Sequence, residues 1–188
     1  MVWIWGILVL AGLLFAAKMA YVVSTALVLP ATRGALYVST SRARIDAALD
    51  AVPMTADQLL VDLGCGDGRV LRRATDRYGV RAVGYELNPM AYLRARLRCM
   101  GNRRLSVVHA NFWQVDIAGA DVVFCYLFPD VMARLAGKLH AEAKTGLQVV
   151  SFNFPVPGIG PGRVMRPTGA LNNDPIFIYR IEPQPDIS

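Results

Sequence analysis

The glycine-rich segment Val61-Asp62-Leu63-Gly64-Cys65-Gly66-Asp67-Gly68-Arg69 constrains this chain more than any other part of it. An apolar run precedes the segment and a helical pattern follows it, so the segment is predicted to be a strand-to-helix loop. A dinucleotide-binding loop of the G-x-G-x-x-G type would need its third glycine where Arg69 stands, which disfavours nicotinamide and flavin cofactors. Glycine has no Cβ and tolerates positive φ, so a ligand could approach this backbone closely, although a turn without a ligand is an alternative.

Short apolar runs alternate with helical patterns from residue 58 onward. The expected strands cover residues 59–63, 81–87, 105–110, 121–126 and 146–154, and the expected helices cover 68–78, 89–100 and 129–143. Repeated strand, helix and strand units predict an α/β fold with a doubly wound, mostly parallel sheet, whose ligands bind at the carboxyl ends of the strands. The Pro- and Gly-rich residues 155–175 are expected to form a loop before one last strand at 176–181.

The N-terminal residues 2–29 form an apolar run in which Lys18 is the one charged residue. A helix of this length, at about 1.5 Å per residue, exceeds the roughly 30 Å thickness of a bilayer's hydrocarbon core. The run is therefore predicted to be a transmembrane anchor, with Trp3 and Trp5 at one interface. Three basic residues follow the run and indicate the cytoplasmic side by the positive-inside rule: Arg33, Arg42 and Arg44. A buried or interfacial helix and a cleaved signal peptide are alternatives. A signal peptide requires a basic residue before its apolar run, and this chain has none there.

The formal net charge of +6 is carried mainly by arginine. Beside a membrane anchor, a basic surface fits attraction to anionic lipid headgroups. Nucleic acid is disfavoured as a partner, because the basic residues are not interleaved with the stacking aromatics that single-strand binders use. Cys65, Cys99 and Cys125 show neither metal-ligand nor disulfide spacing, so we expect buried thiols of a reduced compartment and no metal site.

The D-x-G-x-G-x-G spacing that begins at Asp62 resembles motif I of the class I S-adenosylmethionine-dependent methyltransferases. The resemblance implies a Rossmann-like fold and S-adenosylmethionine as the cofactor. It places six residues of this segment in the cofactor site: Asp62, Gly64, Cys65, Gly66, Asp67 and Gly68. We expect Asp62 to order the amides of the loop, and Asp67 to reach the amino group of the methionine moiety.

Polar and aromatic residues follow the next two predicted strands. Glu86 ends the second strand, 24 residues after Asp62, where a carboxylate can accept hydrogen bonds from both ribose hydroxyls. Asn111 and Phe112 follow the third strand, where this fold meets adenine, so Asn111 is a candidate for the exocyclic amine and Phe112 for the ring face. The alternatives are a surface position for Glu86, an Asx turn for Asn111 and core packing for Phe112.

Tyr126 and Phe128 follow the fourth predicted strand, where this fold places the residues that bind the methyl acceptor. The Asn/Asp-Pro-Pro-Tyr/Phe sequence of enzymes that methylate DNA bases or glutamine is absent, which argues against those acceptors. A neutral amine is already a competent nucleophile, so an enzyme needs mainly to desolvate and align it. The two rings are therefore expected to position a lysine side chain, with simple core packing as the alternative.

Three blocks together, Pro30-Ala31-Thr32, residues 62–69 and Gly84-Tyr85-Glu86-Leu87-Asn88-Pro89, are similar to a narrower family. The chain resembles, in a bacterial-type version, the membrane-anchored mitochondrial lysine methyltransferases that modify ATP synthase subunit c and the adenine nucleotide translocator. This resemblance implies a protein lysine in a membrane-embedded acceptor and a functional role for residues 30–32. The positive-inside rule separately places the catalytic domain on the cytoplasmic side. Two alternatives remain: a methyltransferase for a lipid or quinone, and a non-catalytic S-adenosylmethionine-binding protein.

The expected organisation follows from these observations. A transmembrane anchor is expected at residues 1–30, and a connecting segment with one helix at 31–57. The methyltransferase domain is expected at 58–182, and a frayed tail at 183–188.

Overall fold

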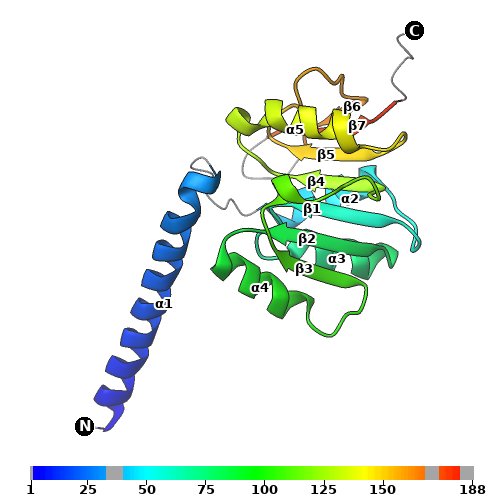
Figure 1. Cartoon of the computed structure of the whole chain (residues 1–188). Coiled ribbons are helices and arrows are strands. Elements are labelled where there is room, and N and C mark those ends of the chain that lie inside the picture. Colours follow the sequence, from blue (N-terminus) through cyan, green and yellow to red (C-terminus); the bar gives the residue numbers. More distant parts are fainter. Residues whose placement is uncertain (1, 33–39, 168–173, 183–188) are drawn as a thin grey trace.

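A computed structural model describes residues 2–32, 40–167 and 174–182 of the chain (Figure 1). Arg33 and the tail at 183–188, both part of the sequence predictions, lie outside these residues. The side chains of Pro30, Ala31 and Thr32 also lie outside the description.

A seven-stranded sheet with the order β3-β2-β1-β4-β5-β7-β6 forms the centre of the fold. Strands β1 to β5 are parallel, while β7 lies antiparallel between β5 and β6. The strands are β1 Leu59–Leu63, β2 Arg81–Glu86, β3 Leu105–His109, β4 Val122–Cys125, β5 Gln148–Phe152, β6 Arg163–Met165 and β7 Ile176–Arg180. The predicted doubly wound α/β sheet is confirmed, with a topological switch point between β1 and β4.

Helices cover both faces of the sheet, and one further helix precedes the domain. The helices of the chain are α1 Val2–Thr32, α2 Arg42–Ala51, α3 Arg69–Tyr78, α4 Pro89–Cys99 and α5 Pro129–Glu142, with a short 3-10 helix η1 at Phe112–Gln114. One buried cluster joins the sheet to Leu49 of α2, Leu71 of α3 and Ala95 of α4. The other joins it to Leu135 and Leu139 of α5. Helices α2, α3 and α4 therefore cover one face, and α5 covers the opposite one (Figure 1).

Local sequence explains where the helices begin. Asn88 caps α4, because its side-chain Oδ1 accepts from the backbone N–H groups of Met90 (2.9 Å) and Ala91 (3.1 Å), and Pro89 occupies the first turn. Ser41 caps α2 through the N–H of Arg44 (3.3 Å). These caps place α4 directly after the carboxyl end of β2 and α2 directly after residue 40.

Two sequence predictions are wrong in detail. Residues 163–165 form strand β6 rather than loop, and this strand pairs with β7 to complete an antiparallel hairpin. A strand of three residues is too short to produce a periodic signal, and its pairing with β7 overrides the surrounding proline and glycine. Helix α1 also continues through Pro30 to Thr32, where a connecting stretch was expected. A proline so close to a helix end removes only one backbone donor.

Helix α1 stands apart from the sheet (Figure 1). Its segment Trp3–Val23 is long and apolar enough to cross a membrane, and none of it is buried inside the structure. Within the domain, α4 lies beside α1 and contacts it: the Arg94 guanidinium of α4 is 5.0 Å from the centroid of the Tyr21 ring of α1. The arrowheads of the parallel strands in Figure 1 point toward the side on which α1 lies. The carboxyl edge of the sheet therefore faces the apolar helix.

Candidate functional site

The glycine loop connects β1 to α3 at the carboxyl edge of the sheet, beside the switch point. Gly64, Gly66 and Gly68 have φ values of 79°, 56° and 75°, in the left-handed region. Residues other than glycine are strained in this region, so the path of the loop depends on all three glycines.

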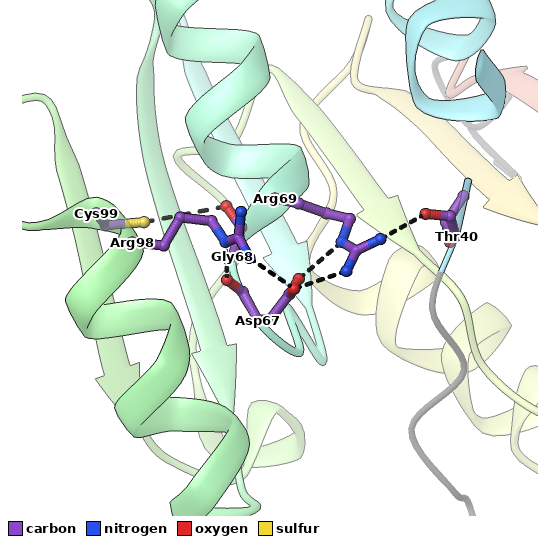
Figure 2. A network of polar contacts seen from close by, with 6 residues as sticks. All are labelled: Thr40, Asp67, Gly68, Arg69, Arg98 and Cys99. Atoms are coloured by element: carbon purple, nitrogen blue, oxygen red, sulfur yellow. Dashed lines mark hydrogen bonds and ion pairs between the residues drawn. The ribbon is translucent and has the colours of Figure 1, made fainter. Parts of the chain in front are cut away.

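The first and the third of these glycines face different surroundings. A Cβ on Gly68 would lie 3.1 Å from Ala95 Cβ and 3.2 Å from Cys99 Sγ, both on α4. Gly68 therefore allows α4 to pack closely against the loop, and Figure 2 shows Cys99 next to the Gly68 carbonyl. A Cβ on Gly64 would meet only Leu127 Cδ2 at 3.8 Å, an ordinary contact. Of these two glycines, Gly64 is the one that leaves open space above the backbone.

Gly84 in β2 has a structural role that the sequence analysis did not assign. A Cβ there would lie 2.5 Å from Leu71 Cδ1, 2.6 Å from Cys65 Sγ and 2.7 Å from Cys65 Cβ. The missing side chain creates the space in which Cys65 sits, beneath the glycine loop. Burial raises the pKa of the Cys65 thiol, so it stays protonated and serves as a small packing group.

Glu86 and the backbone of Tyr85, rather than Asp62, hold the amides of the loop. The N–H groups of Gly64 and Cys65 donate to the Tyr85 carbonyl oxygen, at 2.9 and 3.0 Å. The Gly66 N–H donates to Glu86 Oε2 at 2.8 Å. The expectation that Asp62 orders the loop is therefore wrong, because neighbouring groups of β2 take the donors first.

The Glu86 carboxylate is fixed in place and has capacity to spare. The Asn88 N–H donates to Oε1 at 2.7 Å, so each carboxylate oxygen accepts one backbone bond. A carboxylate offers about four acceptor positions, so capacity remains for hydroxyl donors. Burial raises the pKa of Glu86, although backbone bonds from Asn88, Gly66 and Leu87 oppose this shift. The residues present fit the ribose of S-adenosylmethionine, since a cis-diol needs two acceptors side by side.

Asp62 lies near the carboxyl end of β1 and is buried, with 5% of its surface exposed. Burial raises its pKa to about 8, and the nearby carboxylates of Glu86 and Asp67 add to this shift. At neutral pH the group is therefore mostly a neutral acid that can donate a hydrogen bond. The nearby Glu86 and Asp67 carboxylates, rather than Asp62, carry the negative charge of this region, which favours a cationic ligand.

Two arginines engage Asp67. Arg69 Nη2 lies 2.7 Å and Arg98 Nη2 lies 3.0 Å from Asp67 Oδ2. Burial opposes ionisation of Asp67, but the hydrogen bond from Arg69 and the two positive charges prevail and hold its pKa below the usual value. A methionine ammonium would compete with both guanidinium groups for this carboxylate. Arg69 Nη1 also donates to the Thr40 carbonyl at 3.0 Å, which connects residue 40 to the loop (Figure 2).

Asn111 and Phe112 lie beyond the end of β3, beside Glu86. Strand register pairs Glu86 with His109, and the Ala110 N–H donates to the Glu86 carbonyl at 3.3 Å. Asn111 caps η1, since its Oδ1 accepts from the Trp113 N–H at 3.1 Å. The Phe112 and Trp113 rings pack with centroids 4.5 Å apart. Asn111 thus forms the Asx turn that was the alternative to adenine binding. The turn uses the side-chain oxygen of Asn111 and does not involve its NH₂ group.

The aromatic residues after β4 meet a polar group from β5. The Tyr126 hydroxyl accepts a hydrogen bond from Asn153 Nδ2 at 2.6 Å, and the Phe128 ring stacks on Phe154 with centroids 6.5 Å apart. Asn153 has φ 69° and is the one non-glycine among the described residues with a left-handed backbone. Such strain often marks functional positions. Tyr126 therefore has a fixed hydroxyl rather than a freely packed ring.

Sequence analysis missed the residues that support Tyr126. Arg44 of α2 donates from Nη2 to Asn153 Oδ1 at 2.6 Å, and its guanidinium lies 5.4 Å from the Phe152 ring centroid. Arg44 Nη1 also lies 3.8 Å from Asp174 Oδ2. Arg44 and Asn153 are 109 residues apart, so no local motif signals their contact. The folded topology alone brings α2 to this end of the sheet.

No group of three or more His, Cys, Asp or Glu side chains in the described parts of the chain is arranged to hold a metal ion. Cys65, Cys99 and Cys125 are buried free thiols, as expected.

Comparison with known proteins places this site in a family. A family model described as the ANTKMT methyltransferase domain matches residues 62–163, more than half of the chain. A Saccharolobus islandicus protein named protein-lysine N-methyltransferase is 34% identical over 149 residues, covering 77% of this chain and 92% of that protein. The mouse adenine nucleotide translocase lysine N-methyltransferase is 38% identical over 110 residues, covering 56% of this chain and 48% of that protein. The chain thus spans about half the length of the mouse relative.

A solved structure agrees with the fold. The Salinibacter ruber RNA methyltransferase, in complex with S-adenosyl-L-homocysteine, has a TM-score of 0.73 and 28% identity. The similarity covers 80% of this chain and 98% of that one. The chain therefore belongs to the ANTKMT methyltransferase domain family and is a methyltransferase whose cofactor is S-adenosylmethionine.

Proposed function

We propose that this methyltransferase modifies a lysine side chain of a membrane-associated protein. The observation that carries the proposal is the similarity to a protein-lysine N-methyltransferase over 92% of that relative's length. The orientation of the sheet supports a membrane-associated acceptor, because the carboxyl edge faces the side of the apolar helix α1 (Figure 1).

Within this proposal, the glycine loop and Glu86 bind the cofactor. Gly64 leaves room for the methionine moiety and ribose above the backbone, and Glu86 accepts from the ribose hydroxyls. Asp67 contributes negative charge beneath a cationic ligand and is shared between Arg69 and Arg98, while Asp62 is a neutral acid that can donate a hydrogen bond. Asn111 and Phe112 flank the adenine side of the same edge.

Tyr126 and Phe128 act on the acceptor. When bound, S-adenosylmethionine supplies an electrophilic methyl group on a sulfonium. Aromatic walls disfavour the charged form of an amine, so the lysine gives up its proton to water and reacts neutral. Tyr126 and Phe128 would hold the amine nitrogen in line with this methyl group, so that the N–C bond would form as the C–S bond breaks and leaves its electron pair on sulfur. The Tyr126 hydroxyl, held by Asn153, orients the amine.

No histidine is assigned as a general base in this scheme. His109 Nε2 lies 2.9 Å from the Leu87 carbonyl oxygen, and its ring stacks on Tyr92. His140 lies exposed in the last turn of α5. Both have positions explained by local structure, so the rate is expected to rise with pH toward the pKa of the amine without a bell shape.

One labelling experiment tests the proposal. Membranes are incubated with the full-length protein and a methyl-labelled cofactor, and the label is followed into protein, lipid extract and RNA. Label in a protein band, mapped to lysine by mass spectrometry, is the expected outcome, and Glu86→Ala serves as the matched low-affinity control. Label in the lipid extract would instead identify a lipid or quinone acceptor, and label in RNA would match the acceptor of the Salinibacter ruber RNA methyltransferase. A protein that binds the cofactor but transfers no label would be non-catalytic.

A further inference from the structure

Helix α4 has two apolar faces, and only one of them is explained by the fold. Ala91, Ala95 and Cys99 are buried beneath it, at a four-residue spacing. On the other side, Leu93 and Leu97 are 49% and 61% exposed. Met100, the residue that ends the helix, is 74% exposed. Burial in the domain accounts for the first set and leaves the second without a role.

These three exposed residues form one stripe with arginines on both sides. Positions 93, 97 and 100 follow the i, i+4, i+7 pattern of a single helix face. At about 100° per residue, Arg94 lies on one side of the stripe and Arg96 on the other. An apolar stripe bordered by basic residues is typical of helices that lie in the plane of a membrane surface.

The contact with α1 gives α4 a depth relative to a membrane. Tyr21 is two residues from Val23, where the candidate span ends, which is about 3 Å along a helix axis. The Arg94 guanidinium lies 5.0 Å from the Tyr21 ring centroid. Arg94 is therefore at the level where α1 would leave the bilayer, and Figure 1 shows α4 beside α1.

We propose that α4 docks on the surface of an anionic lipid bilayer. Leu93, Leu97 and Met100 enter the boundary between headgroups and acyl chains, and Arg94 and Arg96 contact lipid phosphates. The docking goes beyond the methyl transfer proposed above and rests on α1 as the anchor. It orients the domain, because α4 begins three residues after Glu86 and so keeps the carboxyl edge close to the membrane surface. A lysine near that surface is then within reach of the acceptor site.

The test places an environment-sensitive fluorophore on the stripe. Leu97→Cys is labelled in the full-length protein, since the native Cys65, Cys99 and Cys125 are buried, and the unsubstituted chain measures any background labelling. The protein is reconstituted in vesicles of phosphatidylcholine alone or with phosphatidylglycerol. Ala133→Cys, exposed on α5 across the sheet, is the matched control. Met100→Cys repeats the measurement at a second position.

The expected result is a blue-shifted emission at positions 97 and 100 that lipid-borne nitroxides at headgroup depth quench, more strongly in the anionic vesicles. The label at position 133 keeps the emission it has in water. If the protein floats with vesicles but labels at positions 97 and 100 emit as the label at 133 does, docking of α4 is overturned and α1 remains the anchor. Protein that fails to float would overturn both. A blue shift without nitroxide quenching would mean that a second copy covers the stripe. Methyl transfer is measured separately, so its loss is distinguishable from a loss of docking.

Discussion

The close packing around Gly84 leaves no room for a side chain, and this gives the sharpest prediction. Gly84→Ala adds a Cβ at 2.5 to 2.7 Å from Leu71 Cδ1 and from Cys65 Sγ and Cβ, about 1 Å closer than ordinary contact. Leu71 can rotate its flexible end, but Cys65 Cβ is fixed to the glycine loop. Overpacking of this kind costs about 1–3 kcal/mol, and the lower entropy of the unfolded chain returns about 0.4–1 kcal/mol. We expect a net loss of about 1 kcal/mol in the free energy of unfolding.

The measurement is urea unfolding followed by circular dichroism in mild detergent, together with calorimetry of cofactor binding. Cofactor affinity should fall as well, because Cys65 must move and its neighbour Gly66 donates to Glu86. Gly137→Ala is the control: it lies exposed in α5 with nothing within 4 Å of an added Cβ, so it should stabilise by about 0.5–1 kcal/mol. If Gly84→Ala unfolds at the wild-type urea concentration and binds the cofactor equally well, the steric reasoning is refuted.

Four further predictions concern ionisable and hydroxyl groups. Glu86→Ala should lose about 1.5–3 kcal/mol of S-adenosylmethionine binding by calorimetry, the usual value for hydrogen bonds to a charged group. Unchanged affinity would remove Glu86 from the ribose site. The pKa of Asp62 is raised from 3.8 to about 8 in the folded state, so the folded protein binds the extra proton between these values and loses stability as the pH rises through them. Between pH 5 and pH 8 the free energy of unfolding, measured with urea, should fall by a few kcal/mol in the wild type but not in Asp62→Asn. An equal pH dependence in both proteins would contradict the shift. Tyr126→Phe should lower kcat while leaving cofactor affinity unchanged, because it removes the hydroxyl that Asn153 holds. His109→Ala should leave the pH–rate profile without a bell shape, and a bell that vanishes in this variant would instead identify a general base.

Sequence reasoning succeeded where a signal is local and periodic. The order of strands and helices from Leu59 to Phe152 follows from apolar runs separated by turns, and the structure reproduces it with ends moved by one or two residues. The glycine motif and Glu86 could be placed at one sheet edge, because the carboxyl ends of parallel strands meet there.

Sequence reasoning failed where a contact depends on distant segments. Nothing near Asn153 indicates that Arg44 reaches it, and nothing near Asp62 indicates that Glu86 takes the loop's amide first. Gly84 belongs to a recognised block, but its steric role appears only when β2 and the loop are packed together. Strand β6 was missed because its pairing with β7, rather than its composition, makes it a strand.

The position of β7 also bears on how this protein can be divided for laboratory work. The family match ends at residue 163, yet β7 at Ile176–Arg180 lies between β5 and β6. A fragment cut to the match would leave β5 with an open edge, and an unpaired edge is a template for aggregation. The same cut would remove Arg44, which supports Asn153. A minimal soluble fragment must therefore run from residue 40 to residue 182, well beyond the borders of the family match.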